Sequence, residues 1–289
     1  MPQFATRYRT EIIEGHELFL REAGDPSHPT VVLLHGFPAS SFMFRELMAA
    51  LADRYHVVAP DQLGFGHSAS PSVDEFEYTF ERLAELTLAL LDRLRIDRFA
   101  LYMQDYGAPI GFRIASRRPA RVTALISQNG NAYVEGITPF WDGLFAYAAD
   151  GVANEREVRE SLGPAGTRWV YAHGVPVPHL ERLSPDTWTL DQVSLERPGN
   201  KEVQLALFRD YRTNVDEYPA FHAYFRAYQP PMLAVWGEHD DIFGPDGARA
   251  FARDLPDAEI QLLDAGHYAL ETSGEEIAEL VRGFLGRVL

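Results

Sequence analysis

One stretch of the sequence restricts the fold more than any other: an apolar run that ends at an aspartate and then changes to a helical pattern. The run is Phe99-Ala-Leu-Tyr-Met-Gln104, the aspartate is Asp105, and residues 107–118 have apolar residues at helical spacing. A strand, one reactive residue at a corner and a helix form the arrangement that presents a nucleophile above a parallel sheet. The pattern therefore predicts an α/β protein with a carboxylate in the nucleophile's place.

Asp105 alone has a simpler interpretation as a helix N-cap, because Asp is among the preferred capping residues. The same corner would aim the backbone N–H groups of the new helix at Asp105, where they would stabilise developing negative charge. The two interpretations are equally good for the isolated stretch, so the rest of the chain has to decide between them.

Strand and helix patterns alternate along most of the chain. Buried strands are predicted at 30–35, 55–60, 122–128, 231–237 and 258–264, and helices at 42–53, 75–96 and 274–289. Residues 7–23 predict two opening edge strands joined at Gly15-His16. Short connections between alternating strands and helices indicate a parallel sheet whose reactive loops gather at the carboxyl ends of the strands.

The strand signal disappears between about residues 132 and 229. That stretch has a helical pattern and many aromatic residues. We expect three segments: a first part of the core at 1–131, an inserted helical cap at 132–229, and a second part of the core at 230–289.

Two further residues follow predicted strands in the order that one triad arrangement on this kind of sheet requires, which is nucleophile, acid and histidine. Asp240 lies in Trp236-Gly-Glu-His-Asp-Asp241, and His267 lies in Asp264-Ala-Gly-His-Tyr268. Each residue alone could be a surface carboxylate or an ordinary loop histidine. Three such residues at three strand ends favour a catalytic triad of Asp105, Asp240 and His267.

Composition narrows the classes of partner. The formal net charge of −16 argues against nucleic acid or an anionic membrane surface, because both require clustered Lys and Arg. The absence of cysteine excludes disulfides and thiolate ligands, and His173 and His179 lack the spacing of metal ligands. We expect no cofactor and no metal. The lack of a long apolar segment or signal-peptide pattern makes a cytoplasmic protein the default expectation.

At this point the chain resembles the α/β-hydrolase superfamily, and specifically its aspartate-nucleophile branch of epoxide hydrolases and haloalkane dehalogenases. The resemblance rests on the triad order, on His35-Gly-Phe-Pro38 and on Asp61-Gln-Leu-Gly-Phe-Gly-His-Ser68. It implies a mostly parallel eight-stranded sheet flanked by helices, with an inserted helical cap. It also implies an oxyanion hole formed by the amides of Phe37 and Tyr106, and a cis peptide bond before Pro38.

The resemblance leaves the leaving group open. In epoxide hydrolases two cap tyrosines donate to the ring oxygen, and one of them maps to Tyr211, with Tyr147 and Tyr171 as candidates for the second. Ordinary packing explains these tyrosines equally well. Haloalkane dehalogenases usually carry Trp directly after the nucleophile, where this chain has Tyr106, but the cap tryptophans, Trp141 among them, keep that hypothesis open.

The sequence thus predicts a hydrolase that opens a small to medium apolar epoxide to a diol through an alkyl ester on Asp105, with water as the second substrate. Haloalkane hydrolysis is the main alternative. An esterase or lactonase and a non-catalytic receptor are weaker ones, and the sequence leaves a homodimer open.

Overall fold

The structure is a computed structural model that describes residues 5–289. Its centre is an eight-stranded sheet with the order β1-β2-β4-β3-β5-β6-β7-β8. The strands are β1 (Arg7–Ile13), β2 (His16–Ala23), β3 (Thr30–Leu34), β4 (His56–Pro60), β5 (Phe99–Gln104), β6 (Val122–Gln128), β7 (Met232–Gly237) and β8 (Glu259–Leu263). From β4 to β8 every pairing is parallel, whereas β2 is antiparallel to both β1 and β4.

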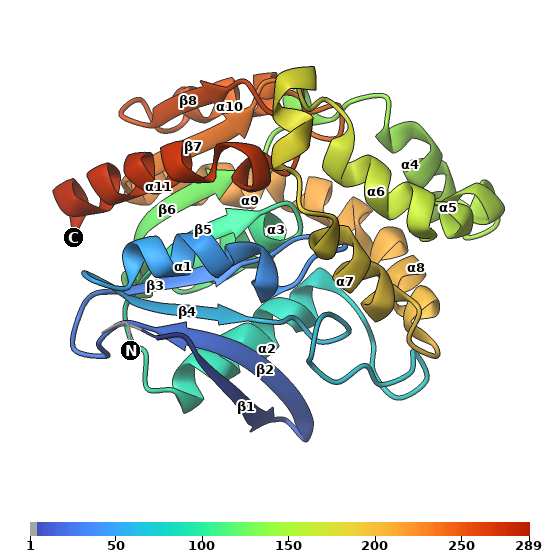
Figure 1. Cartoon of the computed structure of the whole chain (residues 1–289), viewed down its shortest axis with the longest axis horizontal. Helices are drawn as coiled ribbons and strands as arrows, with labels where there is room; N and C mark the ends of the chain where they lie inside the picture. Colours follow the sequence, from blue (N-terminus) through green and yellow to red (C-terminus); the bar gives the residue numbers. More distant parts are fainter. Residues whose placement is uncertain (1–4) are drawn as a thin grey trace.

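Helices cover both faces of this sheet. The core helices are α1 (Arg45–Leu51), α2 (Phe80–Arg93), α3 (Gly107–Arg117), α10 (Pro245–Ala250) and α11 (Ala269–Val288). Short 3-10 turns are η1 (Ser41–Phe44), η2 (Pro119–Arg121) and η5 (Phe251–Arg253). Helices α1 and α11 lie together in front of the sheet in Figure 1, and α2 and α3 lie together behind it. The predicted fold class is confirmed.

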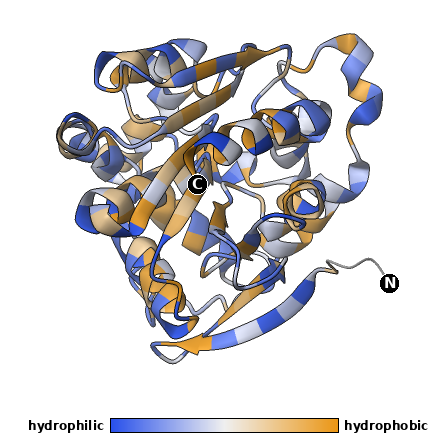
Figure 2. Ribbon diagram, turned by 90° about the vertical axis from the view of Figure 1, so that its left-hand side faces the viewer, coloured by the Kyte–Doolittle hydropathy of each residue, from blue (hydrophilic) through white to orange (hydrophobic). Residues whose placement is uncertain are grey.

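The core consists of apolar strand residues packed between these helices. All six residues of β5 are buried, as are all residues of β4 and β7, which explains why their sequences are nearly continuous apolar runs. Apolar residues are concentrated along the central strands and polar residues on the outer helix surfaces (Figure 2). The strand that leads to Asp105 is therefore fixed on both faces and on both edges.

The chain between β6 and β7 adds helices and no strand to the sheet, and all of residues 129–231 are described. These elements are η3 (Val134–Gly136), α4 (Trp141–Asp150), α5 (Glu155–Ser161), α6 (Pro164–Ala172), η4 (Val177–Arg182), α7 (Pro185–Leu195), α8 (Asn200–Asp210) and α9 (Arg212–Tyr228). Helices α4–α8 lie beyond the carboxyl ends of the parallel strands (Figure 1). The division at 131 and 229 into core and cap remains a prediction.

Some predicted boundaries are wrong for local reasons. Helix α2 begins at Phe80 and not at 75, because the Thr79 side chain caps it by accepting from the backbone N–H of Arg82 at 3.1 Å. The last helix begins five residues before the predicted position, at Ala269, and is interrupted by non-helical backbone at Ser273. No helix among residues 5–289 is both long and apolar enough to cross a membrane.

The opening hairpin also differs in detail. Its turn residues are Glu14 and Gly15, both with positive φ, whereas His16 already belongs to β2. Of the two hairpin strands, only β1 lies at the edge of the sheet, because β2 also pairs with β4. The second outer strand is β8.

Candidate active site

The turn after β5 presents Asp105 at the carboxyl end of the sheet. Asp105 has a φ of +48° and connects the last residue of β5 to the first turn of α3. The close approach of this turn to β3 requires glycine at two positions. A Cβ on Gly107 would collide with the carbonyl oxygen of Leu34, and a Cβ on Gly36 would collide with Asp105 itself. The local sequence thus allows the sharp corner that a nucleophile needs.

Backbone amides face the carboxylate of Asp105. The N–H of Phe37 donates to Oδ1 at 2.6 Å, and the peptide bond from Phe37 to Pro38 is cis, as the resemblance implied. Burial raises the pKa of the Asp105 carboxyl, and this rise is opposed by His267 and by the N–H groups of Phe37 and Tyr106. The two amides are therefore placed to stabilise negative charge on the Asp105 carboxylate.

The histidine and the second aspartate complete a line of contacts behind Asp105. Nε2 of His267 lies 3.7 Å from Oδ2 of Asp105, and Nδ1 of His267 lies 2.8 Å from Oδ2 of Asp240. Burial lowers the pKa of His267, but the charge of Asp240 and its hydrogen bond outweigh burial, so the pKa is raised on balance. The structure brings the three predicted triad residues together from three strand ends, with all three side chains buried.

Two polar residues at this site were not predicted from the sequence. Asn129, which follows β6 with a φ of +48°, donates from Nδ2 to Oδ2 of Asp240 at 2.8 Å. Gln104, the residue before Asp105, has its Nε2 3.1 Å from Nε2 of His267. Their positions in the sequence could have identified them, since both residues lie at the carboxyl ends of buried strands, where reactive loops gather.

A cavity of about 560 Å³ opens above the nucleophile. Its lining includes Asp105, Tyr106 and His267 at one end and mostly apolar side chains elsewhere, such as Leu144, Val170 and Phe208. Cavities of this size and character bind small to medium apolar molecules. The carboxylate thus faces a largely apolar space.

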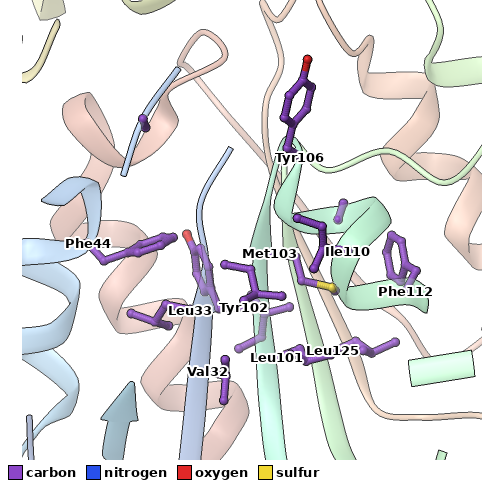
Figure 3. Packing of buried hydrophobic residues seen from close by; sticks show 14 of the residues in the cluster. Val32, Leu33, Phe44, Leu101, Tyr102, Met103, Tyr106, Ile110, Phe112 and Leu125 are labelled. Carbon is purple, nitrogen blue, oxygen red and sulfur yellow. The ribbon is translucent and has the colours of Figure 1, made fainter. Parts of the chain in front are cut away.

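The side chain of Tyr106 points in a different direction from the core side chains near it. Figure 3 shows its ring extending beyond the end of β5, away from the packed side chains of Met103 and Ile110, with the hydroxyl at the tip. That hydroxyl is buried and has no hydrogen-bond partner among residues 5–289. Burial and the nearby charge of Asp105 raise the pKa of Tyr106, so the phenol keeps its proton.

The predicted leaving-group residues divide into two groups. Tyr211 and Trp141 lie close to the site: their rings stack with centroids 4.0 Å apart, and the Tyr211 ring lies 5.8 Å from that of Tyr106. Trp141 lines the cavity, whereas Tyr211 is not part of the lining and stacks on Trp141. The indole N–H of Trp141 donates to the carbonyl oxygen of Ile242 at 2.8 Å, so this N–H is not directed at the nucleophile.

The other two candidates lie outside the cavity lining. The hydroxyl of Tyr171 donates to Oδ2 of the buried Asp191 at 2.5 Å, and its ring stacks on Tyr268. The hydroxyl of Tyr147 is buried without a partner among residues 5–289, and its ring lies under Arg209. A hydrogen bond and ring stacking account for Tyr171, and packing accounts for Tyr147.

The histidines considered as metal ligands have other neighbours. His173 Nε2 lies 2.6 Å from Asp241, and His179 Nδ1 lies 3.2 Å from the carbonyl oxygen of Asp264. Glu238, His239 and Asp264 are close enough together to share an ion, but all three are exposed. Surface carboxylates of this kind are common without any metal.

Comparison with known proteins agrees with this geometry. The model of the α/β-hydrolase fold family matches residues 29–273. The chain is an α/β-hydrolase. It is 40% identical to an uncharacterized hydrolase of Saccharomyces cerevisiae, YNR064C, over 94% of both chains.

Other similar proteins place the hydrolase in the dehalogenase-like branch of the family. It is 30% identical to haloalkane dehalogenase 1 of Mycobacterium bovis, over 87% of this chain and 82% of that one. Among solved structures, a loop variant of haloalkane dehalogenase DbeA from Bradyrhizobium elkanii superposes with a TM-score of 0.77 at 26% identity, covering 98% of this chain and 97% of that one. A hydrolytic reaction is therefore expected of the site described above.

Proposed function

We propose that this hydrolase opens a small to medium apolar epoxide through an alkyl ester on Asp105. Oδ1 of Asp105 accepts from Phe37, which leaves Oδ2 as the attacking atom on the side of His267. Attack on a ring carbon forms the Oδ2–C bond and breaks the C–O bond of the epoxide. A carboxylate needs no base for this step, and the apolar cavity removes the water that would otherwise solvate it.

The observation that carries the proposal is that Tyr106, which follows the nucleophile and lines the cavity, has a buried hydroxyl without a hydrogen-bond partner among residues 5–289. An alkoxide leaving group requires an O–H donor or a proton, and in this proposal the protonated phenol of Tyr106 supplies it. Tyr211 is the second donor in this proposal. Its ring packs against Tyr106, and Asp105 is close enough to contribute to the raised pKa of the Tyr211 phenol.

The second step hydrolyses the ester. His267, oriented by Asp240, takes a proton from water, and the oxygen of that water bonds to Cγ of Asp105. The resulting charge on Oδ1 faces the amides of Phe37 and Tyr106. Collapse of this intermediate breaks the Cγ–Oδ2 bond, and Oδ2 leaves with the diol and takes the proton from His267. The second proton of the water leaves the new Asp105 carboxyl and restores the phenol that protonated the ring oxygen in the first step.

Haloalkane hydrolysis is the second candidate, and the similarity to haloalkane dehalogenases over most of the chain favours it. The two reactions share every step except the departure of the leaving group. A halide needs weak N–H donors and no proton, and the indole of Trp141 is already bonded to Ile242. The tyrosine hydroxyls proposed as donors therefore favour epoxide opening over halide release.

The intact mass of a His267→Gln variant distinguishes these reactions, because loss of the base should leave the ester on Asp105. We would incubate the variant with 1,2-epoxyhexane and separately with 1-bromohexane. A mass gain equal to the whole epoxide supports the proposal, and a hexyl adduct formed only from the bromide supports dehalogenation. The double variant Asp105→Asn/His267→Gln is the control, which should gain no mass. The absence of any adduct from both reagents would contradict both reactions.

A further inference from the structure

The buried amide of Gln104 contacts the catalytic end of His267. Gln104 is the last residue of β5 and is fully buried, and its Nε2 lies 3.1 Å from Nε2 of the imidazole. The amide oxygen is turned the other way. A Cβ built on Gly36 would collide with Oε1 of Gln104, and this oxygen has no donor among residues 5–289.

This contact is compatible with only one protonation state of His267. Nδ1 of His267 carries the proton that Asp240 accepts, so Nε2 is either a bare acceptor or, in the imidazolium, a second N–H. The NH2 group of Gln104 can only donate. It therefore stabilises the neutral imidazole and opposes the imidazolium, in which two N–H groups would face each other.

The other charged or titratable groups around the ring act differently. Asp240 from the loop after β7 and Asp105 from the turn after β5 both stabilise the imidazolium. Tyr268, whose ring contacts His267 edge to face, donates its hydroxyl to the carbonyl oxygen of Phe37, and Tyr171 stacks behind it. Both phenols are neutral because burial raises their pKa values. Burial of the ring opposes the two carboxylates, and the amide N–H of Gln104 acts in the same direction as burial.

We propose that Gln104 is a positioning residue that holds His267 as the neutral imidazole until the attacking water replaces the amide N–H at Nε2. The inference rests on the proposed ester mechanism, in which Nε2 must accept the proton of the attacking water. Without Gln104, a larger fraction of the enzyme would hold His267 as the inactive imidazolium at neutral pH.

The first test needs no substrate. The His267 imidazole would be titrated by NMR in the full chain and in a Gln104→Met variant, and its signals would be assigned by their loss in His267→Gln. Methionine has a similar volume and no N–H donor. We expect the proton affinity of His267 to rise about tenfold in the variant, which is about one pKa unit.

The neighbouring strand provides a matched control. Gln128 pairs with Gln104 in the register of β5 and β6 and is equally buried, but its amide donates to the backbone carbonyl oxygen of His267 at 3.4 Å and accepts from the hydroxyl of Tyr102 at 2.8 Å, so its two hydrogen bonds avoid the imidazole. Gln128→Met should leave the proton affinity of the imidazole unchanged. A Gln104→Glu variant, which is nearly isosteric, should raise this affinity further, and it tests the same point if the methionine variant does not fold.

The second test follows the ester by rapid quench and intact mass between pH 5 and 9. In Gln104→Met the pH profile of ester hydrolysis should shift upward by the same amount, while the alkaline plateau and the rate of ester formation stay within about twofold. Equal slowing at every pH would show a merely structural role and overturn the inference. A lower proton affinity in Gln104→Met would also overturn it, because the amide would then have been accepting from the imidazolium. Failure of the wild-type chain to form any ester would refute the proposed function but leave the NMR result valid.

Discussion

Asn129 donates from Nδ2 to Oδ2 of Asp240 at 2.8 Å, and that oxygen also lies 2.8 Å from Nδ1 of His267. Oδ1 of Asp240 accepts from the backbone N–H of Ile242. Both oxygens of the buried Asp240 carboxylate thus have hydrogen-bond donors. The bond from Asn129 holds Oδ2, the oxygen that orients the imidazole, in position. The amide oxygen of Asn129 in turn accepts from the N–H of Gly237, which ties β6 to β7 at this point.

Removal of this amide should therefore slow ester hydrolysis. A hydrogen bond to a charged group contributes about 1.5–3 kcal/mol, so Asn129→Leu should reduce the hydrolysis rate by roughly 10–100-fold. Asn131→Leu is the control, because Asn131 is also buried but bonds to Tyr133 and Tyr218, away from the triad. Single-turnover decay of the alkyl-enzyme measures the effect. An equal loss in both variants would mean that the bond to Asp240 has no special role.

Replacement of the nucleophile should abolish turnover and keep the fold. Asn tolerates the φ of +48° at position 105, and Asp105→Asn removes a buried charge whose pKa burial already raises. We expect turnover to fall by roughly 10⁴-fold or more, as for loss of other nucleophiles, with an unchanged or higher Tm. Initial rates and thermal unfolding measure these outcomes, and intact mass verifies that the amide persists. Retained activity would rule out Asp105 as the nucleophile.

The pH dependence of ester hydrolysis should follow His267. Only the neutral imidazole accepts a proton, so the rate should rise as the pH increases through its pKa. Because the net effect of Asp240 and burial is a raised pKa, the rise should lie above the usual value of about 6.5. Asp240→Asn removes the largest raising influence, so the rise should move to lower pH and the plateau should fall by roughly 10²-fold. A pH profile that does not move in this variant would contradict the assignment of Asp240.

The phenol of Tyr106 should matter for an oxygen leaving group and much less for a halide. Tyr106→Phe keeps the backbone N–H and removes the hydroxyl, so ester formation from an epoxide should slow by roughly 10²-fold, as for loss of other preorganised donors. Ester formation from a bromoalkane, if it occurs, should change little. Tyr147→Phe removes an equally buried, unpartnered hydroxyl outside the cavity lining and should affect neither reagent. Equal rates for Tyr106→Phe and wild type with the epoxide would refute the proposed donor.

An ion-pair cluster around the buried Glu22 in β2 should contribute to acid stability. Hydrogen bonds from His56 and Arg9 hold the pKa of Glu22 at about 2, well below its usual value. A depressed pKa contributes stability above the unfolded-state pKa, near 4.3, and this contribution is lost as the pH falls toward 2. The wild-type free energy of unfolding should drop by up to about 3 kcal/mol over this window, at about 1.4 kcal/mol per pKa unit. Denaturant titrations at several pH values should show a smaller drop in Glu22→Gln, and an identical drop would refute the role of Glu22.

The sequence by itself determined the fold class and predicted the positions of the candidate reactive residues along the chain. Buried parallel strands carry apolar residues on both faces, and their ends are marked by glycines and by polar residues such as Asp105, Asp240 and His267. These are local signals, so they survive without knowledge of the tertiary structure. Helix starts were less certain, because a cap such as Thr79 outweighs the apolar periodicity of the residues before it.

Only the tertiary structure decided which side chains are available for chemistry. The sequence could not show that the indole of Trp141 is occupied by Ile242, 101 positions away, or that Tyr171 is bonded to Asp191. Nor could it distinguish the free hydroxyl of Tyr106 from those of other buried tyrosines. A hydrogen bond depends on the distance and direction of a partner that any distant segment can supply, and neither quantity is encoded in local spacing.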